Sequence, residues 1–230
     1  MPINRKEREY QLRRELIIDV AEKLFYKKGY ENVTLGDIAK LADYTKKTLY
    51  TYITSKAELY LEVFNRGLMN RKSYIAAVMA HQKTGLDKVK ALGQAYYDFF
   101  RENPSMLLLV QYFDYRGIEY DKVEQSVVDR FITITRETNE EHLQAFHLGL
   151  EDGTINSEVS IEMAYSQFVI SLRAITHQAI VTLVKLPENN YTPEFQNSYF
   201  RYFLDFFIRG IAAKPNKIEK ITLPAEEEKE

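Results

Sequence analysis

Residues 24–59 have the sequence LFYKKGYENVTLGDIAKLADYTKKTLYTYITSKAEL, and this stretch decides the fold. Apolar residues at helical spacing precede Gly29, which stands where a C-terminal helix cap is expected. Thr34 precedes Asp37 by three residues, a spacing typical of a capping box at the start of a second helix. A third short helix is expected over about 45–52. The stretch therefore predicts two short helices, joined by a tight turn, after a longer first helix.

The rest of the chain keeps the helical periodicity, without an alternating strand of useful length. Ser55 and Glu58 have capping-box spacing, so a fourth helix is expected over about 55–80. Asn103 and Thr192 each precede a proline at a first helical position. Further helices are expected over 86–102, 104–116, 120–150, 160–186 and 193–213. The predicted fold is all-α, with an N-terminal three-helix helix-turn-helix domain, a larger C-terminal helical bundle and about nine helices in total.

The net charge of −2 at pH 7 conceals an asymmetry between two parts of the chain. Residues 1–72 contain 15 Lys and Arg against 10 Asp and Glu, a charge of +5. The remainder contains 16 against 23, a charge of −7. Attraction to phosphate is local, because the Debye length is about 10 Å in about 0.1 M salt. The N-terminal part is therefore the candidate binder of a polyanion.

Composition excludes several other classes of site. The chain has no cysteine, which rules out thiolate zinc sites, disulfides and a cysteine nucleophile. Neither a signal peptide nor an apolar run of about 20 residues is apparent, so we expect a cytoplasmic protein with no membrane partner. His142 and His147 are five apart and face different sides of a helix, so no metal site is expected. Without a nucleophile–base pair or a Gly-rich phosphate loop, we expect neither catalysis nor a cofactor.

Spacing in the third helix separates a buried face from an exposed one. Leu49 and Ile53 are four apart and should face inward. A short helix presented in this way fits a major groove about 12 Å wide, and residues of its first turn reach base edges. Either of Lys46 and Lys47 is a candidate donor to guanine O6 and N7, and the other a candidate phosphate contact. Spacing alone leaves two interpretations open: a DNA-reading helix, or a charged helical bundle whose tyrosines and lysines are solvated.

Residues 14–64 resemble the DNA-binding domain of the TetR family of regulators. The resemblance rests on motifs that stand in the family's order: Leu24-Phe25, Gly29, Thr34, Ile38-Ala39, Thr48-Leu49-Tyr50 and Ser55-Lys56. It implies that Tyr50 and Tyr52 contact the sugar-phosphate backbone, that Thr34 donates at the start of helix two, and that Lys56 binds phosphate. Phosphate contacts position the protein, whereas base contacts specify the sequence. The predicted DNA-binding residues are Thr34, Thr45, Lys46, Lys47, Thr48, Tyr50, Tyr52 and Lys56.

The turn departs from the family's usual Ala-Gly-Val-Ser, because this chain has Ala-Asp-Tyr-Thr at 42–45. Asp43 is able to adopt the left-handed conformation that glycine supplies more cheaply, so the turn is feasible. Tyr44 replaces a small core residue, and its ring must either find room or swing outward. Lys47 stands where glycine is common, which allows a longer reach into the groove.

The resemblance implies a DNA-binding domain over 1–55 and an effector-binding and dimerisation domain over 56–214. Residues 215–230, which end in AEEEKE, cannot bury enough apolar surface to become ordered, so a flexible tail is expected there. Aromatic side chains cluster in the second region, and a pocket lined by aromatics with a few polar anchors is typical of a small-molecule site. Most of these rings are expected to be ordinary core. The candidate effector residues are Tyr96, Phe100, Gln111, Tyr112, Arg116, His147, Phe168, Arg173 and His177.

The last two expected helices are strongly apolar, which favours a dimer interface built from two helices of each subunit. Packing only within the subunit is the alternative. The candidate interface residues are Phe168, Ile175, Ala179, Leu183, Phe200, Phe203, Leu204, Phe207 and Ile211.

These expectations describe a dimeric transcriptional regulator that binds a palindromic operator in double-stranded DNA. The family's usual mode is repression relieved by a small molecule, here expected to be largely apolar or aromatic. Two other classes remain open on the sequence: a ligand-independent architectural DNA-binding protein, and a helical enzyme or carrier whose basic head binds an acidic partner.

Overall fold

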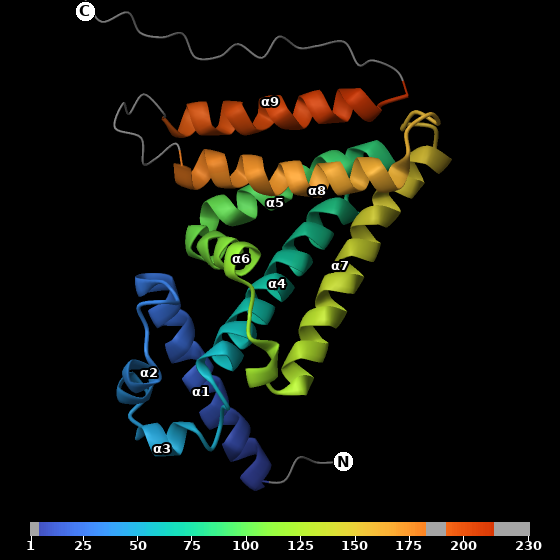
Figure 1. Cartoon of the computed structure of the whole chain (residues 1–230). Helices are drawn as coiled ribbons and strands as arrows, with labels where there is room; N and C mark the ends of the chain where they lie inside the picture. The colour runs from blue at the N-terminus through green and yellow to red at the C-terminus, as the bar shows by residue number, and fades with distance from the viewer. Residues whose placement is uncertain (1–4, 183–191, 214–230) are drawn as a thin grey trace, which may run out of the picture. The chain divides into compact units, whose positions relative to one another are not determined.

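The computed structural model describes residues 5–182 and 192–213. Within these ranges the chain forms nine α-helices, one 3-10 helix and one π-helix, with a single isolated β-bridge between Ile155 and Ala212 (Figure 1). The predicted all-α fold is confirmed. None of the described helices is long and apolar enough to cross a membrane.

The described residues pack as two units, which divide the chain differently from the expected domains. Unit 1 comprises residues 5–70 and 105–136, and unit 2 comprises residues 71–104, 137–182 and 192–213. Helix α4 (Lys56–Ala80) and helix α7 (Gln125–Glu151) each contribute residues to both units. The helix-turn-helix segment is therefore packed with residues that lie beyond 100 in the chain. A functional boundary near residue 55 stays a prediction.

The remaining helices divide between the two units. Unit 1 also contains α1 (Arg5–Lys28), α2 (Leu35–Leu41), α3 (Lys46–Leu49), most of α6 (Pro104–Arg116) and the 3-10 helix η1 (Tyr120–Lys122). Unit 2 also contains α5 (Gly85–Glu102), α8 (Ile161–His177), the π-helix η2 (Gln178–Thr182) and α9 (Pro193–Ile211).

Capping interactions account for most helix boundaries. The Thr34 hydroxyl accepts a hydrogen bond from Asp37 N at 3.1 Å, and the Asp37 carboxylate accepts one from Thr34 N at 2.8 Å, which completes the predicted capping box. The Thr192 hydroxyl likewise accepts from Phe195 N at 3.2 Å. Gly29 has a φ of +77° after α1, as expected for a left-handed cap.

Two expected boundaries and one expected capping role are corrected. The third helix is shorter than predicted, because a turn follows Leu49 at the end of α3. Helix α7 begins at Gln125, after the separate 3-10 turn, so the expected start at 120 is wrong. The Asn103 side chain donates to Phe99 O at 2.8 Å and so closes α5, where a cap for α6 was expected. Residues 183–186 of the expected eighth helix lie outside the described residues.

The core of unit 1 combines aromatic rings with buried charges. Tyr60 is fully buried on α4, and its hydroxyl donates to Leu109 O of α6 at 2.6 Å. The rings of Phe64 and Phe113 stack with centroids 4.8 Å apart. Arg14 Nη2 lies 3.0 Å from Glu58 Oε1 and 2.6 Å from Glu62 Oε1. Helices α1, α4 and α6 are thus held together by both ring packing and ion pairs.

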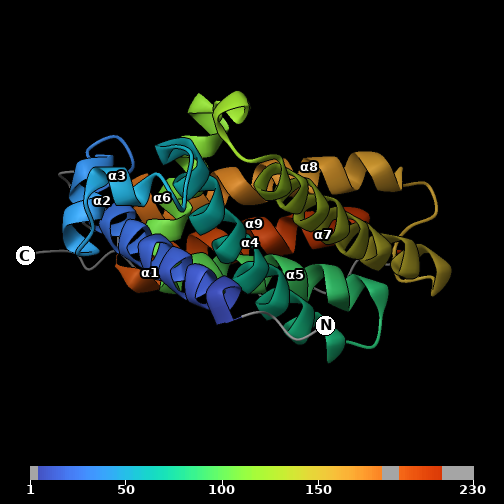
Figure 2. The ribbon, with the colours of Figure 1, turned by 90° about the horizontal axis from the view of Figure 1, so that it is seen from below.

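The core of unit 2 is formed by apolar faces of α5, α8 and α9. Helices α8 and α9 lie side by side in both ribbon views (Figures 1 and 2). The rings of Tyr97 on α5 and Phe200 on α9 stack with centroids 4.1 Å apart. Phe168 on α8 packs against Phe146 and Phe207, with ring centroids 5.7 and 4.7 Å away. Aromatic contacts therefore join each of these helices to its neighbours.

Candidate nucleic-acid interface

The turn between α2 and α3 depends on one left-handed residue. Asp43 has a φ of +63°, as the sequence predicted, and Tyr44 N donates to Ala39 O at 2.9 Å across the turn. Beyond it, Leu49 and Ile53 are both buried, again as predicted. These contacts fix α3 on α2 in the arrangement of a helix-turn-helix.

The opposite face of α3 is polar and open. Lys46 and Lys47 are exposed in its first turn, and Tyr50 retains 50% of its surface. The Thr45 hydroxyl caps the helix by accepting from Thr48 N at 3.1 Å and also lies 2.9 Å from the Thr48 hydroxyl. Two cations therefore stand at the end of the helix that helix-turn-helix proteins direct toward base edges.

Tyr52 is held from a distant part of the chain. Its ring lies 5.0 Å from that of Tyr10 and 6.0 Å from that of Tyr44, centroid to centroid. Tyr44 is half-buried, so its ring has found room beside Tyr52. Arg13 Nη1 donates to the Tyr52 hydroxyl at 3.5 Å, a bond that raises the pKa of Arg13, and the Tyr10 hydroxyl donates to Thr51 O at 3.3 Å. Helix α1 thus supports the segment that follows α3.

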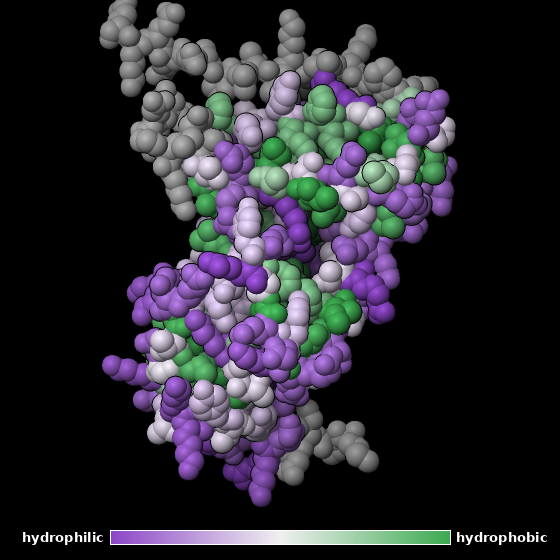
Figure 3. All heavy atoms as spheres, in the orientation of Figure 1, coloured by the Kyte–Doolittle hydropathy of each residue, from purple (hydrophilic) through white to green (hydrophobic). Residues whose placement is uncertain are grey.

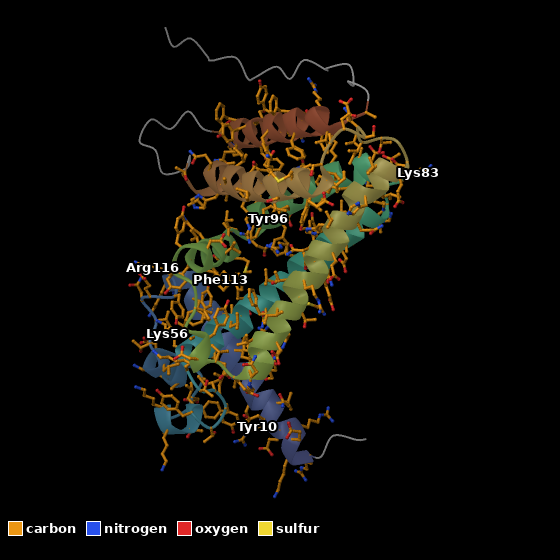
Figure 4. All side chains as sticks on the ribbon, turned by 45° about the vertical axis from the view of Figure 1, so that its right-hand side comes forward. Tyr10, Lys56, Lys83, Tyr96, Phe113 and Arg116 are labelled. Carbon is orange, nitrogen blue, oxygen red and sulfur yellow. The ribbon has the colours of Figure 1, made fainter. Side chains whose placement is uncertain are left out.

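The predicted DNA-binding residues include neither Tyr10 nor Arg13. Tyr10 lies on the N-terminal part of α1 (Figure 4), 41 positions before the residue that it hydrogen-bonds. Neither residue belongs to a spacing pattern that points at α3. Only the packing of α1 against the helix-turn-helix brings them together.

Thr34 and Lys56 already have partners within the chain. The Thr34 hydroxyl donates to Asp37 Oδ2 at 2.6 Å, and hydrogen bonds from Thr34 lower the pKa of Asp37. Lys56 is half-buried, with Nζ 4.1 Å from the centroid of the Tyr30 ring and 3.5 Å from Glu31 O (Figure 4). Burial lowers the pKa of Lys56. Both side chains would have to exchange these contacts for a phosphate.

The predicted effector residues fall into both units. In unit 1, the Tyr112 ring packs 4.9 Å from that of Tyr30, Gln111 is half-buried, and Arg116 is exposed with Nη2 3.9 Å from Glu31. The Tyr112 and Arg116 contacts belong to the packing of that unit. The other candidates lie in unit 2: Tyr96, Phe100, His147, Phe168, Arg173 and His177.

Within unit 2, the structure brings two of these candidates together with a cation. The rings of Tyr96 and Phe100 lie 4.8 Å apart, and the guanidinium carbon of Arg71 lies 5.4 and 5.9 Å from their centroids. Arg71 is half-buried and was not among the predicted residues. Its place on the second half of α4 gave no signal in the sequence, because a lone arginine on a helix is usually a solvated one.

Burial within a single chain covers five of the nine side chains predicted for the dimer interface. Five of the proposed side chains are buried inside unit 2: Phe168, Ala179, Phe200, Leu204 and Ile211. They pack against their own chain and offer no surface to a partner. Ile175, Phe203 and Phe207 are half-buried, and Leu183 lies outside the described residues.

A different apolar face of α8 and α9 is exposed. Met163 and Ile170 on α8 keep 60% and 66% of their surface, and Tyr202 and Phe206 on α9 keep 63% and 73%. Hydrophobic side chains gather over these two helices in the space-filling view (Figure 3). The apolar character that the sequence indicated is therefore present on both faces of the pair.

No group of three or more His, Asp or Glu side chains suited to a metal ion occurs among the described residues. His142 is buried on α7, and this burial, together with the charges of Arg71 and Lys72, lowers its pKa to about 3. Because His142 is buried and neutral and has two cationic side chains nearby, we interpret it as a structural residue and not as a metal ligand.

Comparison with known proteins agrees with the geometry of the helix-turn-helix. Residues 17–63 match the sequence model described as bacterial regulatory proteins, tetR family. The match covers α2, α3 and the turn between them, together with the adjoining parts of α1 and α4. The positively charged, exposed start of α3 lies inside it.

Individual relatives extend the likeness over most of the chain. The transcriptional regulator QacR of Staphylococcus aureus is 25% identical over 84% of this chain and 96% of its own length. The regulator TtgR of Pseudomonas putida is 44% identical, but over only 25% of this chain and 27% of its own. FadR of Bacillus subtilis, solved in complex with stearoyl-CoA, shares the fold with a TM-score of 0.65 at 14% identity, over 86% of this chain and 98% of that one. Residues 17–63 therefore form a DNA-binding domain of the tetR family of bacterial regulatory proteins, and the chain is a DNA-binding transcriptional regulator.

Proposed function

We propose that this regulator is a cytoplasmic repressor without enzyme activity, which binds a palindromic operator as a dimer and leaves it when a small molecule binds. The observation that supports this best is the exposed first turn of α3, with Lys46 and Lys47 beside the left-handed Asp43 turn. A paired arrangement would place two such helices about 34 to 36 Å apart, in successive major grooves.

The contacts divide into base-reading and phosphate-positioning groups. Lys46 and Lys47 supply the donors for guanine O6 and N7 and for a nearby phosphate. Tyr50 and Tyr52 contact the sugar-phosphate backbone, where Tyr52 is steadied by Arg13. The remaining contacts are polar groups at helix starts: Thr34, Thr45, Thr48 and Lys56.

A gel shift against the DNA upstream of the chain's own gene tests DNA binding. The wild type should shift this fragment at low salt, and Lys46→Ala should weaken binding by about tenfold to a hundredfold if it reads a base. Lys83→Ala is the matched control, because it removes the same charge from an exposed site in unit 2 (Figure 4). Absence of a shift with the wild type, or equal weakening by both variants, would contradict the assignment.

The outward face of α8 and α9 is the proposed dimer contact. Its exposed apolar side chains, Met163, Ile170, Tyr202 and Phe206, form a patch of the kind that monomers rarely leave open. A second copy of the chain covers it by two-fold symmetry, giving a four-helix contact.

Sedimentation of the double variant Ile170→Glu and Phe206→Glu tests this contact. The wild type should sediment at twice the 27.0 kDa chain mass, and the variant as the single chain. Tyr115→Glu alters another strongly exposed ring, at 80% of its surface, in unit 1 and should leave the dimer intact. A variant that stays dimeric would exclude this face.

The effector is proposed to bind in unit 2, where Arg71 lies over Tyr96 and Phe100, and to be largely apolar or aromatic. An effector lowers the affinity for the operator by linkage if it binds more tightly to a dimer whose two α3 helices are not spaced for successive major grooves. The FadR structure contains stearoyl-CoA, which makes a long-chain acyl-CoA the first compound to titrate into the gel shift. Release by stearoyl-CoA in the wild type, lost in Tyr96→Ala and kept in Lys83→Ala, would support this site. Equal release from both variants would exclude it.

A further inference from the structure

A pocket of about 330 Å³ lies between α5 and α9 in unit 2. Every residue that lines it carries a polar side chain: Gln94, Tyr97, Asp98, Arg101, Asn197 and Arg201. Small-molecule sites are usually lined mainly by apolar groups, with a few polar ones that fix orientation. This lining therefore suits a hydrophilic ligand, unlike the apolar effector proposed above.

The two arginines of the pocket differ in their partners. Arg101 Nη2 lies 3.2 Å from Asp98 Oδ1, and Arg101 Nη1 donates to Asn197 Oδ1 at 3.3 Å. Among residues 5–182 and 192–213, by contrast, no carboxylate lies within 4.0 Å of the Arg201 side-chain nitrogens. The pocket thus holds one balanced pair of charges and one surplus positive charge.

Hydrogen bonds also fix the orientation of the groups around that charge. Asn197 Oδ1 accepts from the Tyr97 hydroxyl at 3.0 Å as well as from Arg101, so its oxygen is committed and its NH₂ group is turned the other way. Gln94 Nε2 donates to Asp98 Oδ2 at 3.0 Å, which further satisfies that carboxylate. Burial raises the pKa of Tyr97, and Arg101 and Arg201 each oppose this rise through their positive charges.

We infer that this pocket binds a small, polar anion through a carboxylate or phosphate group held by Arg201. A guanidinium matches the oxygens of either group with two parallel hydrogen bonds. The Asn197 amide supplies a further donor, and Asp98 with Arg101 forms a neutral wall that limits the ligand's charge. The site is separate from the DNA-reading surface and from the rings of Tyr96 and Phe100.

Calorimetric titration of the full chain with sodium phosphate and, separately, sodium succinate tests the inference, with chloride adjusted to hold ionic strength constant. Saturable binding of at least one anion is expected. The anion that binds more tightly shows whether the pocket prefers a phosphate or a carboxylate group. Arg201→Ala should weaken this binding by about tenfold or more. Arg209→Ala removes the same charge about two turns farther along α9, outside the pocket, and should bind as the wild type does.

Arg201 is exposed, so its replacement should leave the urea midpoint unchanged, and a loss of binding then reports the site itself. Failure of the wild type to bind either anion saturably would overturn the inference. So would equal affinity in Arg201→Ala and the wild type.

Discussion

The two units of the chain stabilise their interiors in different ways. Every charged side chain that is buried among the described residues belongs to unit 1: Arg14, Glu58 and Glu62. The buried polar residues of unit 2 are Thr138, His142 and Thr176, none of which carries a charge at neutral pH. Burying a charged side chain costs free energy that only a well-placed partner offsets. A buried ion pair therefore restricts the relative positions of the helices that carry it.

This difference fits the tasks proposed for the two units. In unit 1, Glu62 also accepts from Arg130 of α7 at 2.9 Å, and Glu58 accepts from Thr54 N at 3.0 Å. Helix α4 is thus fixed by directional contacts to α1, to α7 and to the segment that follows α3. In the interior of unit 2 the helices meet through rings and aliphatic side chains, which tolerate sliding better than ion pairs do, and the polar contacts of Asn197 with Tyr97 and Arg101 lie around the pocket between α5 and α9. A unit that must accommodate a ligand gains from that tolerance.

Arg14→Met gives the largest expected effect, because it leaves the carboxylates of Glu58 and Glu62 buried beside each other. We expect the free energy of unfolding to fall by about 3–5 kcal/mol in urea titrations. Lys23→Met, at an exposed position of the same helix, should change it by less than about 0.5 kcal/mol. Comparable small losses in both variants would show that the buried ions do not hold unit 1 together.

Gly85→Ala probes the close packing of unit 2. A Cβ at this position would come within 1.9 Å of the backbone nitrogen of Gly149, so α5 and α7 would have to move apart. The expected loss is about 1–3 kcal/mol by thermal or urea unfolding. Gly210→Ala meets no atom within 4 Å and should be neutral or slightly stabilising, since alanine favours helix. Unchanged stability of Gly85→Ala would mean that unit 2 adapts even at backbone contacts.

His142 should make unit 2 sensitive to pH. Its pKa in the folded chain, about 3, lies below the ordinary 6.5, so only the unfolded chain binds the proton between these values. The contribution is therefore fully present above pH 6.5 and is lost as pH falls through that window. Between pH 7.5 and 5.5 the wild type should lose about 1.4 kcal/mol more than His142→Gln in urea titrations. Parallel losses in both would place the titrating group elsewhere.

Asp43→Gly is expected to have the smallest effect, and a favourable one. The left-handed φ of +63° strains any residue with a Cβ, and glycine relieves the strain at some entropic cost. We expect stabilisation of about 0.5 kcal/mol, with operator affinity unchanged, because the turn keeps its shape. Destabilisation would indicate that the Asp43 side chain itself makes a contact of value.

Local signals were enough to predict the helical fold and the candidate interface. Thr34, Thr192 and Gly29 each act within a few residues of their own position, so their roles could be read from spacing. The inward direction of Leu49 and Ile53 follows in the same way from helix geometry. Asn103 shows the limit of such signals. Its side chain stands between the end of α5 and the start of α6, and spacing alone does not tell which of the two helices it caps.

The places of the helices, the turn between α2 and α3 and the cations beside that turn depend on neighbours along the chain, so they could be predicted from the residues alone. Long-range packing was needed to show that Tyr10 and Arg13 support Tyr52, that Arg14 meets Glu58 and Glu62, and which apolar face of α8 and α9 stays open. Those contacts join residues far apart in the sequence. Helical periodicity shows that a helix has an apolar face, but not whether its own chain or a partner covers it.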